Sequence, residues 1–272
     1  MSIFSTFEQR NKSTRLTLNK VIDSFLNMSY HIFMTPLFKT QFSIGKSLLT
    51  ANNVLEIAKK NSLEKVVCVE DSFYGFRTLK QKLIENDLKF IFGIRLPVVQ
   101  NHADSDSRPS KLIFFAKNNL GISAIKSLYT ASFTSEEGCL SMSDYDKSFF
   151  KDISVAVPFY DSYIYNNLFH FGLCDLSLDG IDHQYLIEDN DHPFDFQIKK
   201  SIDSLGVKTL ETKSIYYKNR SDFHAFQMYK SVCSRRQGRP PTFNSPNLDH
   251  FCSEEFCWES FIEKRQDILE KG

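Results

Sequence analysis

Two adjacent carboxylates, Glu70 and Asp71, are the side chains best placed to do chemistry, because they follow the apolar run 66–69 (Val-Val-Cys-Val). An apolar run that ends in carboxylates predicts a buried parallel strand with a polar tip. In parallel sheets, the polar side chains at the carboxyl ends of strands usually form the functional site. Asp71 is therefore the first candidate site residue.

The acidic stretch 179–195, which also contains His183 and His192, is a second candidate site. Carboxylates and imidazoles are metal ligands. The histidines of the chain nevertheless form no pair at ligand spacing on one element. A solvated loop is the simpler interpretation of this stretch, because charge runs usually face water.

Two motifs could bind phosphate groups. The segment 45–47 (Gly-Lys-Ser) resembles the end of a phosphate-binding loop, but the pattern requires a glycine where this chain has Thr40. A basic, proline-bearing loop at 235–241 provides candidate nucleic-acid contacts in Arg235, Arg236 and Arg239. Because 33 basic residues balance 33 acidic ones, the overall charge does not favour direct nucleic-acid binding, and an exposed loop is the simpler interpretation.

The composition is that of an ordinary soluble globular protein, with 272 residues of which 42% are hydrophobic and 24% charged. A chain of this length fits a single α/β barrel domain. The six cysteines include no Cys-x-x-Cys pair, so neither a disulfide framework nor a zinc knuckle is indicated. No apolar run is long enough for a membrane span and no signal-peptide pattern is present, so we expect a cytoplasmic location.

The elements that must position these residues alternate between strands and helices, which favours a parallel barrel over a sandwich. Strands are predicted at 30–38, 66–70, 90–94, 111–116, 153–157, 171–178 and 207–210. Helices are predicted at 52–61, from after the strand at 66–70 to about residue 85, at 121–132, between 157 and 171, at 192–205 and at 222–234. Asn52 or Asn53 is the expected cap of the first of these helices. The segment 253–262 is expected to fold back on the body through its aromatic residues.

In this order the segments resemble the PHP (polymerase and histidinol phosphatase) domain of bacterial DNA polymerase III alpha subunits. The resemblance is carried by residues 53–97, 111–132, 205–232 and 250–261, and it covers about residues 29–262. It implies a distorted (β/α)7 barrel at 29–262. An amphipathic N-terminal extension, 1–28, would be helical and dock on a partner, and 263–272 would form a tail.

The resemblance also implies where metal ligands would lie, because working members of the family hold up to three metal ions at the carboxyl ends of the strands. Among the positions that match the family's metal ligands, only Asp71 carries the same residue as the family. The other matched positions are Phe33, Thr35, Ser72, Arg95, Lys111, Phe159, Ser214 and Tyr216. We therefore expect no metal, no cofactor and no catalytic residue.

The replacements suggest what holds the barrel mouth together instead. Arg95 and Lys111 would place positive charge where the resemblance puts divalent cations. An ion pair between Asp71 and Arg95 is expected to replace the metals, while Phe33, Phe159 and Tyr216 fill the mouth with apolar volume. The alternative is that Arg95 and Lys111 contact a phosphate group without a metal.

The leading hypothesis is a catalytically inactive PHP-like subunit that scaffolds a replicative polymerase of the DNA polymerase III type, encoded by a phage or a reduced genome. Its expected partners are the polymerase catalytic subunit, another replisome protein or the proofreading exonuclease, with DNA bound only indirectly and no membrane. One alternative is a metal-dependent phosphoesterase or exonuclease with a site rebuilt around Glu70, Asp71 and residues 179–195. A second alternative is an inhibitor or decoy of a host polymerase.

Overall fold

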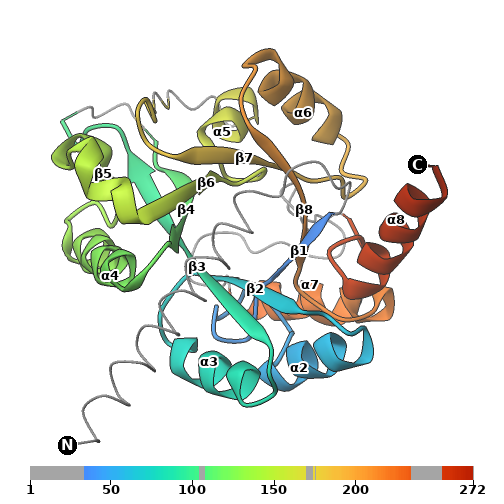
Figure 1. Cartoon of the computed structure of the whole chain (residues 1–272). Helices are drawn as coiled ribbons and strands as arrows, with labels where there is room; N and C mark the ends of the chain where they lie inside the picture. The colour runs from blue at the N-terminus through green and yellow to red at the C-terminus, as the bar shows by residue number, and fades with distance from the viewer. Residues whose placement is uncertain (1–33, 104–107, 170–173, 175, 234–252, 272) are drawn as a thin grey trace, which may run out of the picture.

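Seven strands close into a barrel that is surrounded by helices (Figure 1), as the expected (β/α)7 architecture requires. The computed structural model describes residues 34–103, 108–169, 174, 176–233 and 253–271. The barrel strands are β1 (Thr35–Phe38), β2 (Lys65–Glu70), β3 (Lys89–Val99), β4 (Ser110–Ala116), β6 (Ile153–Val157), β7 (His183–Ile187) and β8 (Thr209–Ile215). Pairing of β2 with both β1 and β3 closes the ring.

One strand departs from the predicted parallel order. β4 runs antiparallel to β3 and to β6, whereas the other pairs of the ring are parallel. The reason is the connection: only residues 100–109 separate β3 from β4, and so short a connection joins antiparallel strands, because a parallel crossover needs a dozen or more residues. A two-residue strand outside the ring, β5 (Leu140–Ser141), pairs in parallel with the last residues of β3.

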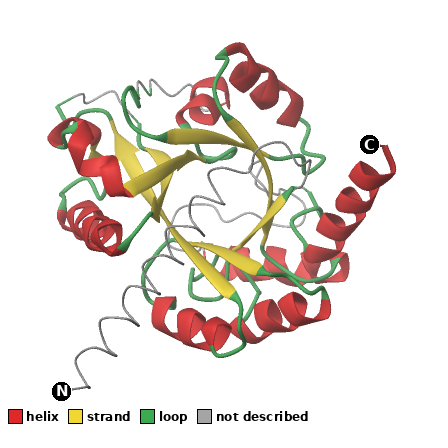
Figure 2. Ribbon diagram, viewed as in Figure 1, coloured by secondary structure: helices red, strands yellow, loops and turns green. Residues whose placement is uncertain are grey.

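Helices form the outer layer (Figure 2), and the described ones are α2 (Ala51–Lys60), α3 (Phe76–Ile84), α4 (Asn119–Thr134), α5 (Tyr163–Phe169), α6 (Asp195–Ser204), α7 (Phe223–Cys233) and α8 (Trp258–Lys271). Short 3₁₀ turns cover Met142–Asp144, Lys147–Asp152 and Arg220–Asp222. The segment 253–262 does fold back on the body, burying Phe256, Trp258 and Phe261. Because α8 continues to Lys271, the boundary expected at 262 falls inside a helix. The predicted extension 1–28 lies outside the described residues.

Among the boundaries that differ from the prediction, three have a clear local reason. The cap of α2 is Thr50. Its hydroxyl accepts a hydrogen bond from the Asn53 backbone N–H, and the Asn53 side chain accepts one from the Thr50 backbone N–H. Residues 176–178 are not strand; Leu176 and Leu178 are buried as loop residues on the core, and the strand comes later, as β7. The helix expected from His192 begins at Asp195, because Asp195 itself accepts the backbone N–H groups of Asn190 and His192.

Aliphatic and aromatic side chains of the described strands fill the barrel interior with a packed core. The interior cluster consists of Leu37, Val67, Val69, Ile91, Ile113, Phe115, Ala156 and Leu186. Two further clusters pack the helices onto the outside of the sheet. Among the described residues, no helix combines the length and apolarity needed to cross a bilayer.

Candidate functional site at the barrel mouth

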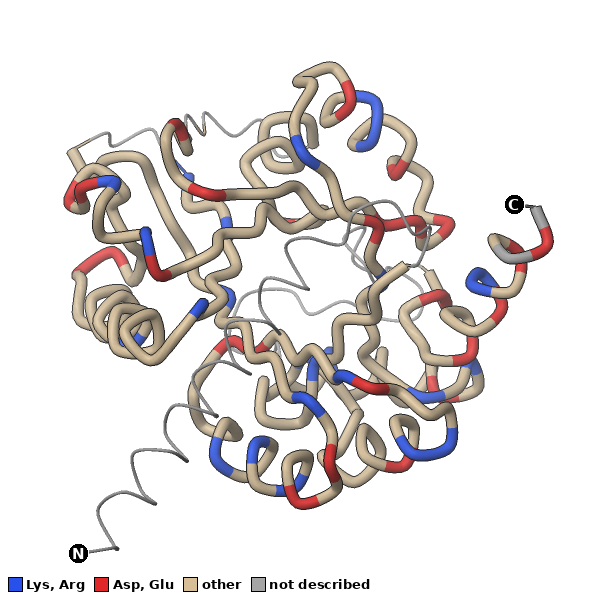
Figure 3. Tube along the Cα trace, in the orientation of Figure 1, with Lys and Arg blue, Asp and Glu red and all other residues tan. Residues whose placement is uncertain are grey.

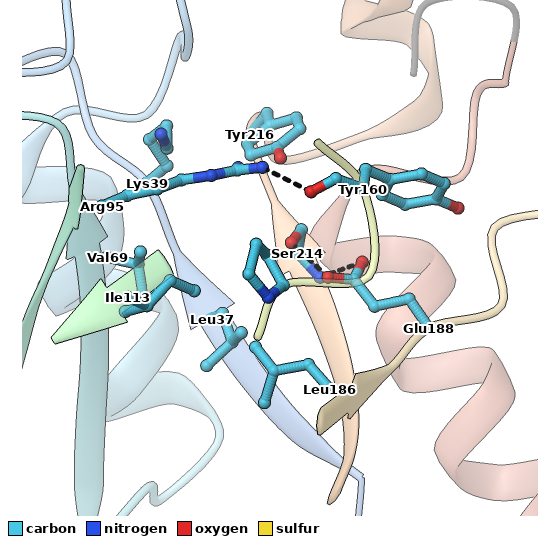
Figure 4. A pocket seen from close by; sticks show the side chains of 11 residues that line it. Leu37, Lys39, Val69, Arg95, Ile113, Tyr160, Leu186, Glu188, Ser214 and Tyr216 are labelled. Carbon is cyan, nitrogen blue, oxygen red and sulfur yellow. Dashed lines mark hydrogen bonds between the residues drawn. The ribbon is translucent and has the colours of Figure 1, made fainter. Parts of the chain in front are cut away.

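Polar side chains gather above the packed interior, at the carboxyl ends of the strands (Figure 4). The floor of this site is aliphatic, formed by Leu37, Val69, Ile113 and Leu186. Its upper rim is polar and consists of Lys39, Arg95, Tyr160, Glu188, Ser214 and Tyr216. These side chains therefore form a candidate site at the strand ends, with an apolar floor and a charged rim.

Asp71 pairs with Lys39 across the ends of β2 and β1. The Lys39 Nζ lies 2.7 Å from the Asp71 carboxylate, and the Lys39 side chain is only 6% exposed. Burial alone would raise the pKa of Asp71, but the charges of Lys39, Lys111 and Arg95 outweigh burial and hold this pKa well below its usual range. The Asp71 carboxylate is therefore held in its ionised form by the surrounding cations. The expectation of a direct ion pair between Asp71 and Arg95 was therefore wrong.

Arg95 instead pairs with Asp161, which follows β6. One guanidinium nitrogen donates to the Asp161 carboxylate at 3.0 Å and to the Tyr160 carbonyl at 2.8 Å. Lys111 approaches the same carboxylate at 3.5 Å, and its backbone N–H donates to the Asp161 carbonyl. Asp161 has φ of 60°, a left-handed conformation that Asp tolerates better than most residues. Two cations from two strands therefore converge on one carboxylate.

Glu188, at the end of β7, belongs to a separate hydrogen-bond network. It accepts the Ser214 hydroxyl at 2.7 Å, the Ser214 backbone N–H at 3.0 Å and the Asn190 amide at 3.0 Å. These three donors fix the carboxylate against β8. Ser214 is thus at the site, as predicted, but as a hydrogen-bond donor.

Glu70, the neighbour of Asp71, supports the chain after β1. Its fully buried carboxylate accepts hydrogen bonds from the Thr40 backbone N–H and hydroxyl, at 2.9 and 2.6 Å, and from the Ser43 hydroxyl. Burial raises the pKa of Glu70, and these hydrogen bonds oppose that rise. Because the Glu70 carboxylate already accepts these hydrogen bonds from Thr40 and Ser43, it is not available to bind a metal together with Asp71.

The paired side chains also line a second pocket, which we call the cationic pocket. Its described lining residues are Lys39, Lys46, Asp71, Arg95, Lys111, Asp161, Tyr216 and Lys230. Lys46 is presented by a turn at Gly45, which has φ of 75° and packs so closely on Cys233 that an added Cβ would lie 2.8 Å from the Cys233 Cβ. Burial, reinforced by the charges of Lys46 and Lys39, lowers the pKa of Lys230 to about 6.

The other predicted positions are distributed differently. Thr35 lies at the amino end of β1, so the site is instead lined by Leu37 of β1 and by Lys39, which follows the strand. The Ser72 hydroxyl accepts the Tyr74 backbone N–H and does not line either pocket.

Of the two described aromatic residues expected at the mouth, Phe159 and Tyr216, only Tyr216 lines it. Phe159 is buried in the outer core, and it is Tyr160 that faces the mouth. Tyr216 lines both pockets, stacked on Phe256. Phe33, Arg235, Arg236 and Arg239 lie outside the described residues.

The acidic stretch 179–195 forms no metal site. Asp182 pairs with Lys117 at 2.6 Å, Asp189 and Asp191 pair with Lys264, and Asp195 accepts the Tyr160 hydroxyl. In the part of the chain that the structure describes, no group of three or more His, Cys, Asp or Glu side chains could hold a metal ion. The donor set of the mouth, rich in ammonium and guanidinium groups, does not fit a divalent cation.

Sequence reasoning did not single out Lys39, Tyr160, Asp161 or Lys230, and it included Glu188 only as part of the acidic stretch 179–195. Lys39, Asp161 and Glu188 each follow a strand within a few residues, which is the same signal that identified Asp71. Lys230 lies on α7 and reaches the pocket through tertiary packing alone, so no local pattern could have found it.

The fold and mouth together define a seven-stranded α/β barrel whose strand ends are joined by ion pairs. No family model and no curated protein matches the sequence. Among solved structures, a protein assigned as a metal-dependent phosphoesterase from Bifidobacterium adolescentis is 19% identical over 36% of this chain and 35% of its own, with a TM-score of 0.26. An amidohydrolase from Chromobacterium violaceum, with bound sulfate and no metal, is 13% identical over 36% of this chain and 34% of its own, with a TM-score of 0.26. Each likeness spans about a third of the neighbour's length and says nothing of activity.

Proposed function

We propose that this chain is a PHP-like barrel that works without a metal centre, as a non-catalytic subunit of a replicative DNA polymerase. The observation that carries the proposal is the pairing at the mouth, where Lys39 is bound to Asp71 and Arg95 to Asp161. These cations occupy strand ends where metal chemistry would require carboxylates and imidazoles.

The charges of the mouth argue against hydrolysis. A metal-dependent phosphoesterase needs anionic ligands that offset the metal charge and lower the pKa of a bound water. Here the two carboxylates of the cationic pocket are already paired with lysine and arginine. A divalent cation would have to displace those partners and face the remaining lysines, which is electrostatically unfavourable.

The polymerase context is supported by the order of PHP-like segments over residues 29–262. A neutral chain, with basic and acidic residues interspersed along the described backbone (Figure 3), suits contact with another protein better than direct contact with DNA. The expected partner is therefore the polymerase catalytic subunit, or the proofreading exonuclease bound to it.

The test is to purify the chain together with the polymerase III-type catalytic subunit from the same genome and to assay hydrolysis of a phosphodiester with Mn²⁺ present. The proposal expects one stoichiometric complex on size exclusion and no hydrolysis. Hydrolysis that is lost in Asp71→Asn would make the chain a phosphoesterase. Binding to a host polymerase, with inhibition of its synthesis, would make it a decoy.

A further inference from the structure

A pocket lies on the outer side of the barrel wall, between α3 and α4. The segment 100–109 is too short for a crossover helix, so α3 and α4 are the helices that flank the outer faces of β3 and β4 (Figure 1). The space between them has a volume of about 160 Å³, and we call it the outer pocket. Among the described residues it shares no lining residue with the two pockets of the mouth.

The walls of the outer pocket are apolar. Ten of its twelve described lining residues are hydrophobic, and four phenylalanines among them, Phe73, Phe76, Phe90 and Phe92, are only partly buried. The Phe76 and Phe92 rings meet edge to face with centroids 4.9 Å apart, and Ile84 at the rim is 52% exposed. Protein interiors seldom leave a void of this size, and a water molecule there would lack the hydrogen-bonding partners it needs. The aromatic surface is therefore available to an apolar ligand.

Lys80 gives the outer pocket a positive charge. Lys80 and Asn119 are the two polar residues of the described lining, which contains no carboxylate. The Lys80 Nζ lies 5.7 Å from the centre of the Phe76 ring, so the ammonium group lies beside the apolar wall. No ion pair joins Lys80 to another residue that the structure describes, and its charge is therefore not offset within the pocket. A ligand with an apolar body and an anionic head group would match both the wall and this charge.

We propose that the outer pocket binds a small amphiphilic carboxylate, with its apolar tail against Phe76, Phe92 and Ile122 and its carboxylate on Lys80. The volume suits a tail of about six to eight carbon atoms, since an apolar cavity of about 150 Å³ in another protein takes up benzene. One ammonium group matches the single charge of a carboxylate, whereas a phosphate monoester would bring close to two negative charges. Asn119, the first residue of α4, adds a side-chain amide donor.

The test is isothermal titration of the full chain with three ligands that share one alkyl tail and differ in head group: octanoate, octanol and octylamine. Lys80→Gln removes the charge at an exposed position and leaves the core intact. Ala116→Leu fills the outer pocket from the end of β4, and a melting curve reports whether this variant is folded. Lys60→Gln, at the exposed end of α2, is the matched control.

We expect octanoate to bind about tenfold more tightly than octanol or octylamine, because only the carboxylate pairs with Lys80. Lys80→Gln should remove that preference, Ala116→Leu should abolish binding, and Lys60→Gln should change neither. The inference is overturned if octanoate does not bind, if octanol or octylamine binds as tightly, if Lys80→Gln keeps the preference, or if a folded Ala116→Leu still binds octanoate. Each of these results leaves the proposed function standing, because the outer pocket is separate from the mouth.

Discussion

Asp161 is the residue on which two cations of the mouth depend, since Arg95 lies 3.0 Å and Lys111 3.5 Å from its carboxylate. Removing that charge leaves the largely buried guanidinium of Arg95 without its counter-ion. We expect Asp161→Asn, which also tolerates the left-handed backbone, to lower the free energy of unfolding by roughly 2 kcal/mol, less than for a fully buried pair because Asp161 is 28% exposed. Urea denaturation measures this.

The control for that variant is Asp182→Asn, which breaks the more exposed pair with Lys117. Surface pairs contribute little, so the expected loss is below about 1 kcal/mol. Equal losses of unfolding free energy in the two variants would show that the ion pair at the mouth stabilises the protein no more than a surface pair does.

Lys213 makes the stability of the protein depend on pH. Its side chain is fully buried, and burial together with the charge of Lys264 lowers the pKa of Lys213 from 10.5 to about 8. Between these values the unfolded chain binds the proton and the folded protein does not, so this residue makes stability rise with pH. Relative to Lys213→Met, the wild-type protein should gain about 1 kcal/mol per pH unit between pH 8 and 9.

Denaturation of both proteins across that range tests the expectation. Lys199→Met, which removes a half-exposed lysine, is the control and should run parallel to the wild type. If Lys213→Met also runs parallel, the buried lysine does not titrate as described.

At the scale of elements, α4 depends on one close contact. Asn118 caps the helix, and a Cβ added at Gly121 would lie 2.1 Å from the backbone oxygen of Asp152. Backbone cannot give way as a flexible side chain can, so Gly121→Ala should destabilise the protein by roughly 2 kcal/mol. Ser123→Ala, on the exposed face of the same helix, should change stability by less than about 0.5 kcal/mol. Thermal unfolding compares the two, and equal effects would contradict the packing argument.

The elements that the sequence predicted well were those with a strong local pattern. The strand before Asp71 was predicted from its apolar run, and the helix predicted at 121–132 is present as Asn119–Thr134. The antiparallel direction of β4 was missed, because direction depends on how residues 100–109 connect two strands and no local pattern encodes that. The apolar segment that contains Leu176 and Leu178 was taken for a strand, since burial alone cannot separate a packed loop from a strand.

At the scale of the whole molecule, the sequence indicated which residues gather at the barrel mouth but not how they pair. Asp71, Arg95, Lys111, Ser214 and Tyr216 all line the mouth, because strand ends converge there whatever the side chains are. Which carboxylate each cation selects is decided by tertiary geometry. Both β1, which Lys39 follows, and β3, which carries Arg95, pair with the strand that Asp71 follows, so strand order alone does not decide the choice; in the structure Lys39 pairs with Asp71 and Arg95 with Asp161.

The central claim, that ion pairs hold this mouth together without a metal, is tested most directly by the metal content of the chain purified without chelator. Elemental analysis for zinc, manganese and iron, with a melting curve before and after chelation, gives the answer. We predict far less than one metal ion per chain and an unchanged melting temperature. Two or three tightly held metal ions per chain, with a melting temperature that falls on their removal, would contradict the account.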